Sequence, residues 1–234
     1  MTQAPHHSSS NALIKRHTAV KERLNAINDT CQANPKAVLL AVSKTKPSSD
    51  IATLYQAGQG DFGENYLQEA LIKINELAHL SITWHYIGHI QRNKTKDIAT
   101  HFDWVQTVER DIIAQRLSDQ RPDDRPPLNV LIQINIDDEA SKSGCHIDEL
   151  DELVQTVMGL PKLRLRGLMI IPSKDGTDAF VRTKAIFDDI KGRFDLPDFD
   201  TLSMGMSGDM EQAVAHGSTM VRVGTAIFGE RDYG

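Results

Sequence analysis

Lys44 is the residue of this chain whose type and position point most directly to chemistry. It follows the apolar run Ala37–Val42, so its aliphatic stem is expected to lie against apolar side chains. A lysine in such surroundings loses its proton more easily than one in water, and a neutral amine can condense with an aldehyde as a Schiff base. The alternative is that Lys44 only carries its charge out to solvent, as Lys46 is expected to do.

Two turns rich in glycine and hydroxyl groups follow each other near the end of the chain. The first contains Ser207, Gly208 and Asp209, and the second contains Gly224 and Thr225. Backbone amides where a helix begins can bind an anion such as a phosphate. Ser207 could equally be a plain helix cap, and the charge of Asp209 would repel a phosphate unless it points outward.

Arg222 lies two residues before Gly224, so alternation along a strand places both on the same side. An arginine that points into the interior of a protein costs free energy unless it is paired. Arg222 therefore requires a partner, which is either one of the 32 acidic residues or an acceptor on a ligand.

Three further polar residues lie within or at the end of predicted strands. Asn65 is either a helix cap or a ligand contact, and His89, at a strand-to-helix turn, is a candidate to face a ligand. His85 precedes an aromatic residue within a strand, so we expect it to be a hydrogen-bonded core histidine.

Short apolar segments alternate with helical patterns along the chain. Strands are predicted at 37–42, 61–63, 84–87, 104–107, 128–136, 163–169, 201–203 and 220–223. Helical patterns are predicted from 11 to about 31, and at 50–57, 65–77, 91–100, 109–120, 146–158, 177–194 and 208–216. This alternation indicates βαβ units and a parallel sheet.

Eight such units can close into a (β/α)8 barrel. An open doubly wound sheet shares the alternation, but the chain lacks the glycine-rich nucleotide loops usual in that fold. The sequence therefore predicts an α/β fold, with a single (β/α)8 barrel over residues 11–234, an extra N-terminal helix and a disordered tail over residues 1–10. In such barrels a phosphate commonly lies after the seventh and eighth strands, at the face where residues that follow strands meet.

Composition argues against several classes of protein. The net charge of −6 disfavours nucleic-acid binding, and the apolar runs are too short to span a membrane. The N-terminal residues lack the apolar core of a signal peptide, which predicts a cytoplasmic protein. The two cysteines are too few for a disulfide framework. No metal site is expected, since the adjacent His6 and His7 make no closed site, and without a long apolar stripe we expect a monomer.

Together these segments resemble the pyridoxal phosphate homeostasis protein family, the single-domain relatives of alanine racemase. The resemblance runs from about Val38 to Tyr233. It rests on AVSK from Ala41, FGENY from Phe62, WHYIGHIQRNK from Trp84, the segment from Asn135 through Glu139 and Lys142 to Gly144, GLMIIP from Gly167, the Ser203–Met210 segment, and RVGT from Arg222. Two residues depart from the family pattern: Gly208 stands where Asn or Asp is usual, and Ile90 where Leu is common.

The resemblance implies that Lys44 carries pyridoxal 5′-phosphate as a covalent aldimine and that Arg222 faces the pyridine nitrogen. The other residues implied at the cofactor are Asn65, His89, Met204, Ser207, Gly224 and Thr225, of which the last three would hold the phosphate. An arginine stays protonated, so the ring nitrogen that faces it tends not to be. Since an unprotonated pyridine is a weaker electron sink, this arrangement limits carbanion chemistry.

Racemisation also needs a second acid or base on the opposite face of the cofactor. In alanine racemases this group is a tyrosine from an additional C-terminal β domain. No tyrosine of this chain lies in a segment that matches the one carrying that racemase tyrosine; the tyrosines are Tyr55, Tyr66, Tyr86 and Tyr233.

The expected function is therefore that of a cytoplasmic carrier of pyridoxal 5′-phosphate, without robust catalysis, in vitamin B6 and amino-acid homeostasis. Apoenzymes that depend on this cofactor are the expected recipients. Two alternatives stay open. One is a slow racemase with a base such as His89, and the other is a barrel lyase or aldolase that uses Lys44 on a phosphorylated sugar without a cofactor.

Overall fold

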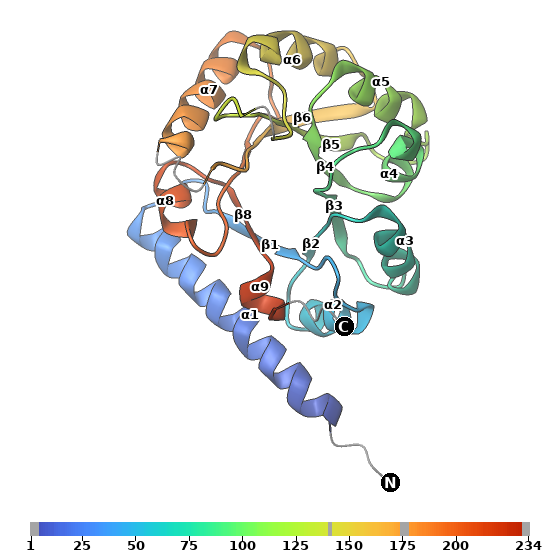
Figure 1. Ribbon diagram of the computed structural model, residues 1–234, viewed down its shortest axis with the longest axis vertical. Helices are drawn as coiled ribbons and strands as arrows, with labels where there is room; N and C mark the ends of the chain where they lie inside the picture. Colours follow the sequence, from blue (N-terminus) through green and yellow to red (C-terminus); the bar gives the residue numbers. More distant parts are fainter. Residues whose placement is uncertain (1–4, 140–141, 174–177, 231–234) are drawn as a thin grey trace.

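Eight parallel strands form a closed barrel with helices around it (Figure 1). The computed structural model describes residues 5–139, 142–173 and 178–230. The strands are β1 (Val38–Val42), β2 (Asp61–Glu64), β3 (Thr83–Tyr86), β4 (Trp104–Val108), β5 (Leu128–Gln133), β6 (Leu163–Met169), β7 (Thr201–Ser203) and β8 (Met220–Val223). The prediction of a (β/α)8 barrel is confirmed.

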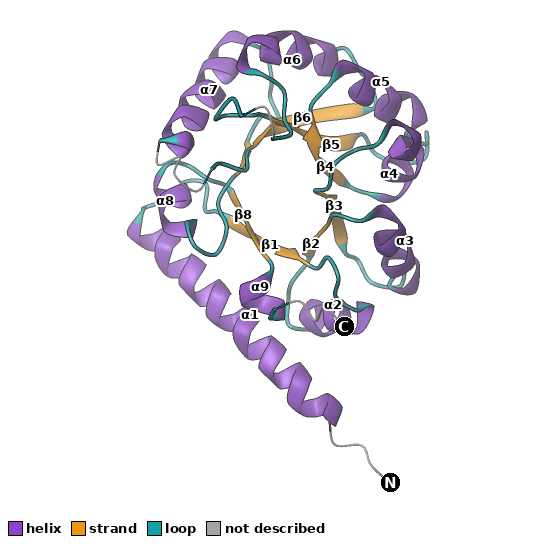
Figure 2. Cartoon of the chain, viewed as in Figure 1, coloured by secondary structure: helices purple, strands orange, loops and turns teal. Residues whose placement is uncertain are grey.

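Helices form the outer layer, outside the ring of strands (Figure 2). They are α1 (Pro5–Thr30), α2 (Ser48–Gln56), α3 (Leu67–Glu76), α4 (Thr95–His101), α5 (Asp111–Gln120), α6 (Leu150–Met158), α7 (Ala179–Arg193), α8 (Met210–Ala215) and α9 (Thr225–Phe228), with 3₁₀ turns η1 (Arg92–Lys94) before α4 and η2 (Ile147–Glu149) before α6. Helices that pack on the strands bury one stripe, as α6 shows. In α6 the buried residues Leu150, Leu153, Val154 and Val157 recur at helical spacing.

The strands separate two buried regions. The main hydrophobic cluster, which includes Leu39 and Ala41 of β1, packs between the strands and the helices. Leu40, which lies between them, is buried but outside that cluster. Since neighbours across a parallel register share a face, Leu40 and its partner Arg222 both point into the barrel interior.

The long helix α1 packs across α2, α8 and α9 on the outside of the barrel (Figure 1). It buries Leu13, Leu24 and Ile27. The helix begins at Pro5, so the segment expected to form a tail over residues 1–10 is helical from Pro5 on, and residues 1–4 lie outside the described residues. Proline suits the first turn of a helix, because its missing N–H would have no partner there in any case.

Two further elements differ from the sequence prediction. The strand predicted over 128–136 ends at Gln133, since the Asn135 side chain bonds the backbone of Glu139 and turns the chain. The short helix α9 was not predicted, because four residues are too few to show helical periodicity. Over the described ranges, no helix combines the length and the apolar character needed to cross a bilayer.

Candidate functional site

Lys44 lies just beyond the end of β1, at the seam where the barrel closes. There β1 pairs with β8, with Leu40 opposite Arg222 and Ala41 opposite Val223. One pocket at this seam is lined by Val42, Lys44, Thr45, Lys46, Gly224, Thr225, Phe228 and Gly229. Barrel closure thus brings the lysine predicted from the first strand to the turn predicted after the eighth.

The turn that carries Lys44 is strained. Thr45 has a φ of 64°, in the left-handed region that a β-branched residue avoids. Two bonds hold it there: the Lys46 amide donates to the Ser43 carbonyl at 3.1 Å, and the Thr45 amide donates to Oε1 of Glu69 at 2.6 Å. Strain of this kind persists only where the surroundings fix it, and it gathers at functional sites.

A buried ion pair lies under the same turn. Oε1 of Glu64 accepts hydrogen bonds from the Ser43 hydroxyl at 2.6 Å and from Nζ of Lys73 at 2.8 Å, and Lys73 also donates to the Ser43 carbonyl. Burial raises the pKa of Glu64, and the charge of Lys73 offsets part of that rise. Ser43, the residue before Lys44, is therefore fixed through both its side chain and its backbone.

The turn after β7 presents free amides. Asp209 is the N-cap of α8, so Ser207 is not the cap. The Asp209 carboxylate accepts a hydrogen bond from the Met206 amide at 2.5 Å, which occupies it within the turn. Among the described residues, the amides of Ser207 and Gly208 have no hydrogen-bond acceptor.

The turn after β8 is built in the same way. Gly224 lies close to β1, since a Cβ at this position would come within 3.3 Å of the Val42 carbonyl oxygen. Thr225 begins α9 and is exposed, and the amides of Gly224 and Thr225 have no acceptor within the described ranges. The two turns are adjacent, because the Arg222 amide donates to the Gly205 carbonyl at 3.0 Å.

Arg222 is buried in the barrel interior with 6% of its surface exposed. Its guanidinium donates to three neutral acceptors: the Ser203 carbonyl at 2.7 Å, the Ser203 hydroxyl at 2.8 Å and the Ile170 carbonyl at 2.7 Å. No carboxylate of the described residues forms an ion pair with it. Burial lowers the pKa of Arg222 to about 10, and the charge of Asp209 offsets part of that change.

The remaining predicted residues lie in different surroundings. Oδ1 of Asn65 is buried and lacks a hydrogen-bond partner in the described structure, and Asn65 is not a helix cap, since α3 is capped by Tyr66. The His89 side chain is 58% exposed, with Nδ1 3.6 Å from Oε1 of Glu109. Met204 is engaged in packing: its side chain lies in the main hydrophobic cluster, and its backbone bonds Met220 and Ser218.

His85 is a buried, hydrogen-bonded core histidine, as predicted. Its neighbours Gln106 and Ser203 were not singled out from the sequence. Both lie at inward-facing positions of their strands, and a polar residue at an inward position of a buried strand is the signal that could have identified them.

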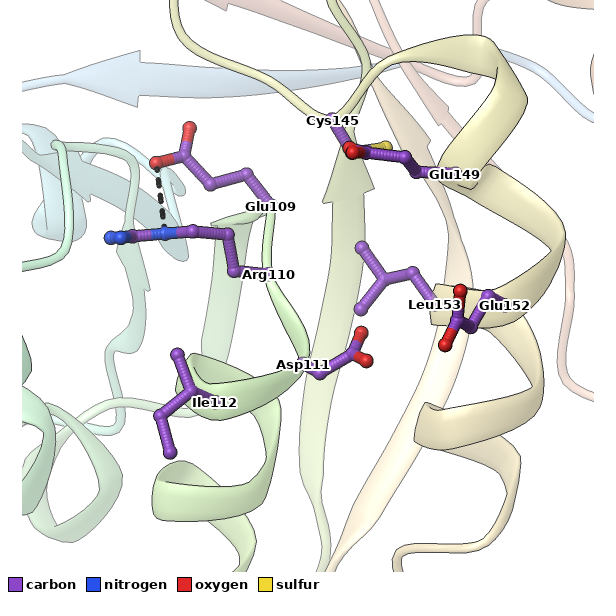
Figure 3. Close-up of a pocket in the computed structure, with 8 residues that line it drawn as sticks. All are labelled: Glu109, Arg110, Asp111, Ile112, Cys145, Glu149, Glu152 and Leu153. Carbon is purple, nitrogen blue, oxygen red and sulfur yellow. Dashed lines mark ion pairs between the residues drawn. The ribbon is translucent and has the colours of Figure 1, made fainter.

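A second pocket lies outside the barrel mouth, between the start of α5 and the start of α6 (Figure 3). Among the described residues, four carboxylates line it, from Glu109, Asp111, Glu149 and Glu152, and Arg110 is the one cation. This charge disfavours an anionic ligand. In the described part of the chain, no group of three or more His, Cys, Asp or Glu side chains is placed to hold a metal ion.

Comparison with known proteins gives consistent relatives. Residues 16–232 match the alanine racemase N-terminal domain. The chain is 53% identical over 223 residues to the pyridoxal phosphate homeostasis protein of Escherichia coli, covering 92% of this chain and 94% of the relative. The protein of that name from Pseudomonas aeruginosa is 51% identical over 221 residues, again covering 92% and 94%.

A solved structure resembles the barrel closely. PipY of Synechococcus elongatus, with PLP bound, superposes with a TM-score of 0.81 and 30% sequence identity, covering 93% of this chain and 100% of PipY.

Proposed function

Since this chain belongs to the pyridoxal phosphate homeostasis protein family and has the alanine racemase N-terminal domain, we propose that it binds pyridoxal 5′-phosphate covalently and acts as a cytoplasmic carrier of that cofactor. The observation that carries the proposal is the shared pocket at the barrel seam. Lys44 lines it together with Gly224 and Thr225, so an amine lies beside a turn whose amides have no acceptor among the described residues.

The two turns after β7 and β8 supply the phosphate contacts. The amides of Ser207, Gly208, Gly224 and Thr225 are available, and Ser207 and Thr225 add hydroxyl groups. The Asp209 carboxylate keeps its negative charge, and its Oδ1 is engaged within the turn by the Met206 amide. Backbone amides of this kind bind phosphate oxygens without a cationic side chain.

Lys44 supplies the covalent bond. Its amine would attack the aldehyde carbon of the cofactor, and water would leave. Bound pyridoxal 5′-phosphate supplies an electron sink for reactions at amino-acid carbons. The strain at Thr45 and the bonds to Ser43 hold the backbone on both sides of Lys44, which orients its side chain toward the pocket.

Arg222 is suited to meet the pyridine nitrogen. Its pKa of about 10 keeps the guanidinium protonated at neutral pH, so it donates a hydrogen bond and leaves the ring nitrogen unprotonated. An unprotonated ring withdraws electrons weakly, which favours holding the cofactor over catalysis. Asn65, with a buried oxygen that lacks a partner among the described residues, is a further acceptor near the strand ends.

An absorbance titration tests the proposal. Adding pyridoxal 5′-phosphate to the purified protein should produce a new band in the near-ultraviolet or visible range, and pyridoxal without the phosphate should bind far more weakly. A colourless protein would favour a lyase or aldolase that needs no cofactor.

Deuterium exchange tests the absence of catalysis. The loaded protein should not exchange the α-proton of L- or D-alanine in deuterated buffer at turnover rates. Exchange at such rates, lost in His89→Ala, would instead establish the slow racemase. We also propose that apoenzymes receive the cofactor from this chain, so transfer to an apoenzyme should exceed release into buffer.

A further inference from the structure

The barrel interior contains polar side chains that the proposed site does not use. Interiors of (β/α)8 barrels are usually filled with bulky branched apolar residues. Here Ser203, Gln106 and His85 are fully buried in that space. Since a buried polar group costs free energy unless it is hydrogen-bonded, each of them needs a partner.

The partners form one continuous chain of hydrogen-bonded side chains, the hydrogen-bond chain, which starts at Arg222. Nη1 of Arg222 donates to the Ser203 hydroxyl at 2.8 Å, and that hydroxyl donates to Oε1 of Gln106 at 2.6 Å. Nε2 of Gln106 lies 3.0 Å from Nδ1 of His85, and Nε2 of His85 lies 3.1 Å from Oδ1 of Asp61. The five side chains come from β8, β7, β4, β3 and β2.

The guanidinium sets the direction of every bond in this chain, because it has donors and no acceptor. The Ser203 hydroxyl accepts from Arg222, so its own hydrogen goes to Gln106. The Gln106 amide then turns its nitrogen to His85. Nδ1 of His85 must accept that bond, so the ring hydrogen lies on Nε2 and points at Asp61.

Packing holds the chain in place. The His85 ring stacks on Trp104, with ring centroids 5.3 Å apart and planes 15° from parallel. The guanidinium of Arg166 lies over the Trp104 ring, 4.7 Å from its centroid. Gln106 also contacts the sulfur of Met220 at 3.1 Å. The rings and the amide therefore have little freedom to turn.

We propose that Ser203, Gln106 and His85 are positioning residues that hold the Arg222 guanidinium in the orientation in which it meets the pyridine nitrogen. This inference rests on the proposed function, since the ligand role of Arg222 belongs to it. Asp61 lies at the far end of the hydrogen-bond chain. It begins β2, and its side chain is 40% exposed, so the hydrogen-bond chain spans the barrel from the proposed cofactor end to the opposite face.

Two substitutions separate positioning from packing. Ser203→Ala and Gln106→Leu break the chain at neighbouring links without changing Arg222. Each should weaken binding of pyridoxal 5′-phosphate about fivefold to tenfold and shift the absorption maximum of the bound cofactor. The double variant should bind no more weakly than Ser203→Ala alone, because Gln106 reaches Arg222 only through Ser203.

Gln133→Leu is the matched control. Gln133 is also a buried glutamine of a barrel strand, but its Nε2 donates to the Ser143 carbonyl, which is not part of the hydrogen-bond chain. This variant should leave the absorption maximum unchanged. If Ser203→Ala and Gln106→Leu lower the melting temperature while the maximum and the affinity stay at wild-type values, the inference is overturned.

A measurement on the unmodified protein covers the case in which these variants do not fold. Nitrogen-15 NMR of the wild-type protein should show His85 with its hydrogen on Nε2, and a hydrogen on Nδ1 would overturn the proposed direction of the chain. The outcomes also separate the two proposals. No cofactor band in the wild type defeats the proposed function and this inference with it, whereas a wild-type band that both variants reproduce defeats this inference alone.

Discussion

Glu64 is a buried acid that bonds the residue before Lys44. Its Oε1 holds the Ser43 hydroxyl and Lys73, while its Oε2 has no hydrogen-bond partner within the described chain. Desolvation outweighs the attraction of Lys73 and raises the pKa of Glu64 above the ordinary value of 4.5. The folded protein therefore holds this proton to a higher pH than the unfolded chain does.

The raised pKa predicts a pH dependence with a definite sign. As pH rises from 4.5 through the folded-state pKa, the unfolded chain loses the Glu64 proton first, so wild-type stability falls. Glu64→Gln stays neutral and removes this loss. Urea unfolding of both proteins should show the free-energy advantage of the variant growing over that interval and then levelling off. An advantage that shrinks with rising pH would show that the pKa is lowered.

Gly205 shapes the turn that leads to Ser207. Its φ is 93°, and a Cβ at this position would come within 2.5 Å of the Ala213 Cβ. Gly205→Ala should therefore cost about 1–3 kcal/mol of unfolding free energy. Gly208→Ala is the matched control in the same turn, since its φ is ordinary and a Cβ there meets nothing within 4 Å. Equal unfolding free energies for the two variants would contradict this account of the turn.

The helix α1 contacts the turn after β7 and the helix α9, which follows the turn after β8, from outside the barrel. Nε of Arg16 donates to the Ile227 carbonyl at 2.7 Å, at α9, and Nη1 of Arg23 donates to the Ser207 carbonyl at 2.9 Å. Two side chains on one helix thus bond the turn after β7 and the helix that follows the turn after β8. An element that the barrel itself does not require has a direct structural link to the site.

This link predicts an effect on affinity. Arg16→Ala and Arg23→Ala should each raise the Kd for pyridoxal 5′-phosphate about twofold to tenfold, the value of one net hydrogen bond. Lys15→Ala on the same helix should leave the Kd unchanged. Fluorescence or absorbance titration measures all three. Affinity that is insensitive to both arginine changes would mean that the turns hold their shape without α1.

The order of elements could be read from the sequence because short strand-like segments, of which Val38–Val42 is apolar on both sides, alternate with segments of helical periodicity. The strand ends at Val42, Ser203 and Val223 follow from that pattern. Helix α9 could not be predicted from the sequence, because Thr225–Phe228 is too short to show helical periodicity. The start of α1 could not be predicted either, since the first turn of the helix lacks apolar residues that would indicate a buried face.

Individual residues of the candidate site were predicted from the sequence, but their assembly into one pocket was seen only in the structure. Lys44 and Thr225 are 181 positions apart along the chain, by subtraction of their numbers, and they meet because β1 pairs with β8. The hydrogen-bonded side chains of Ser203, Gln106 and His85 lie on three different strands, so no local sequence pattern indicates their contacts. Contacts of this kind depend on barrel register, which a single sequence does not reveal.

The whole barrel matters to the proposed function because its seam joins the Lys44 amine to the turn proposed to bind phosphate. Each half of that site alone, a strand-end lysine or a glycine turn, is common in proteins with other roles. Their meeting in one pocket is what distinguishes a carrier of an aldehyde phosphate from an ordinary barrel. The claim that Lys44 bonds the cofactor is therefore the one on which the account depends.

Borohydride reduction of the protein mixed with pyridoxal 5′-phosphate, followed by peptide mass mapping, tests that claim most directly. Reduction makes the bond between amine and cofactor permanent, so the modified lysine can be identified. We expect the added mass on the peptide that contains Lys44, and no such adduct at this site in a correctly folded Lys44→Ala protein. Stoichiometric modification of Lys46, Lys73 or another lysine in place of Lys44 would contradict the account.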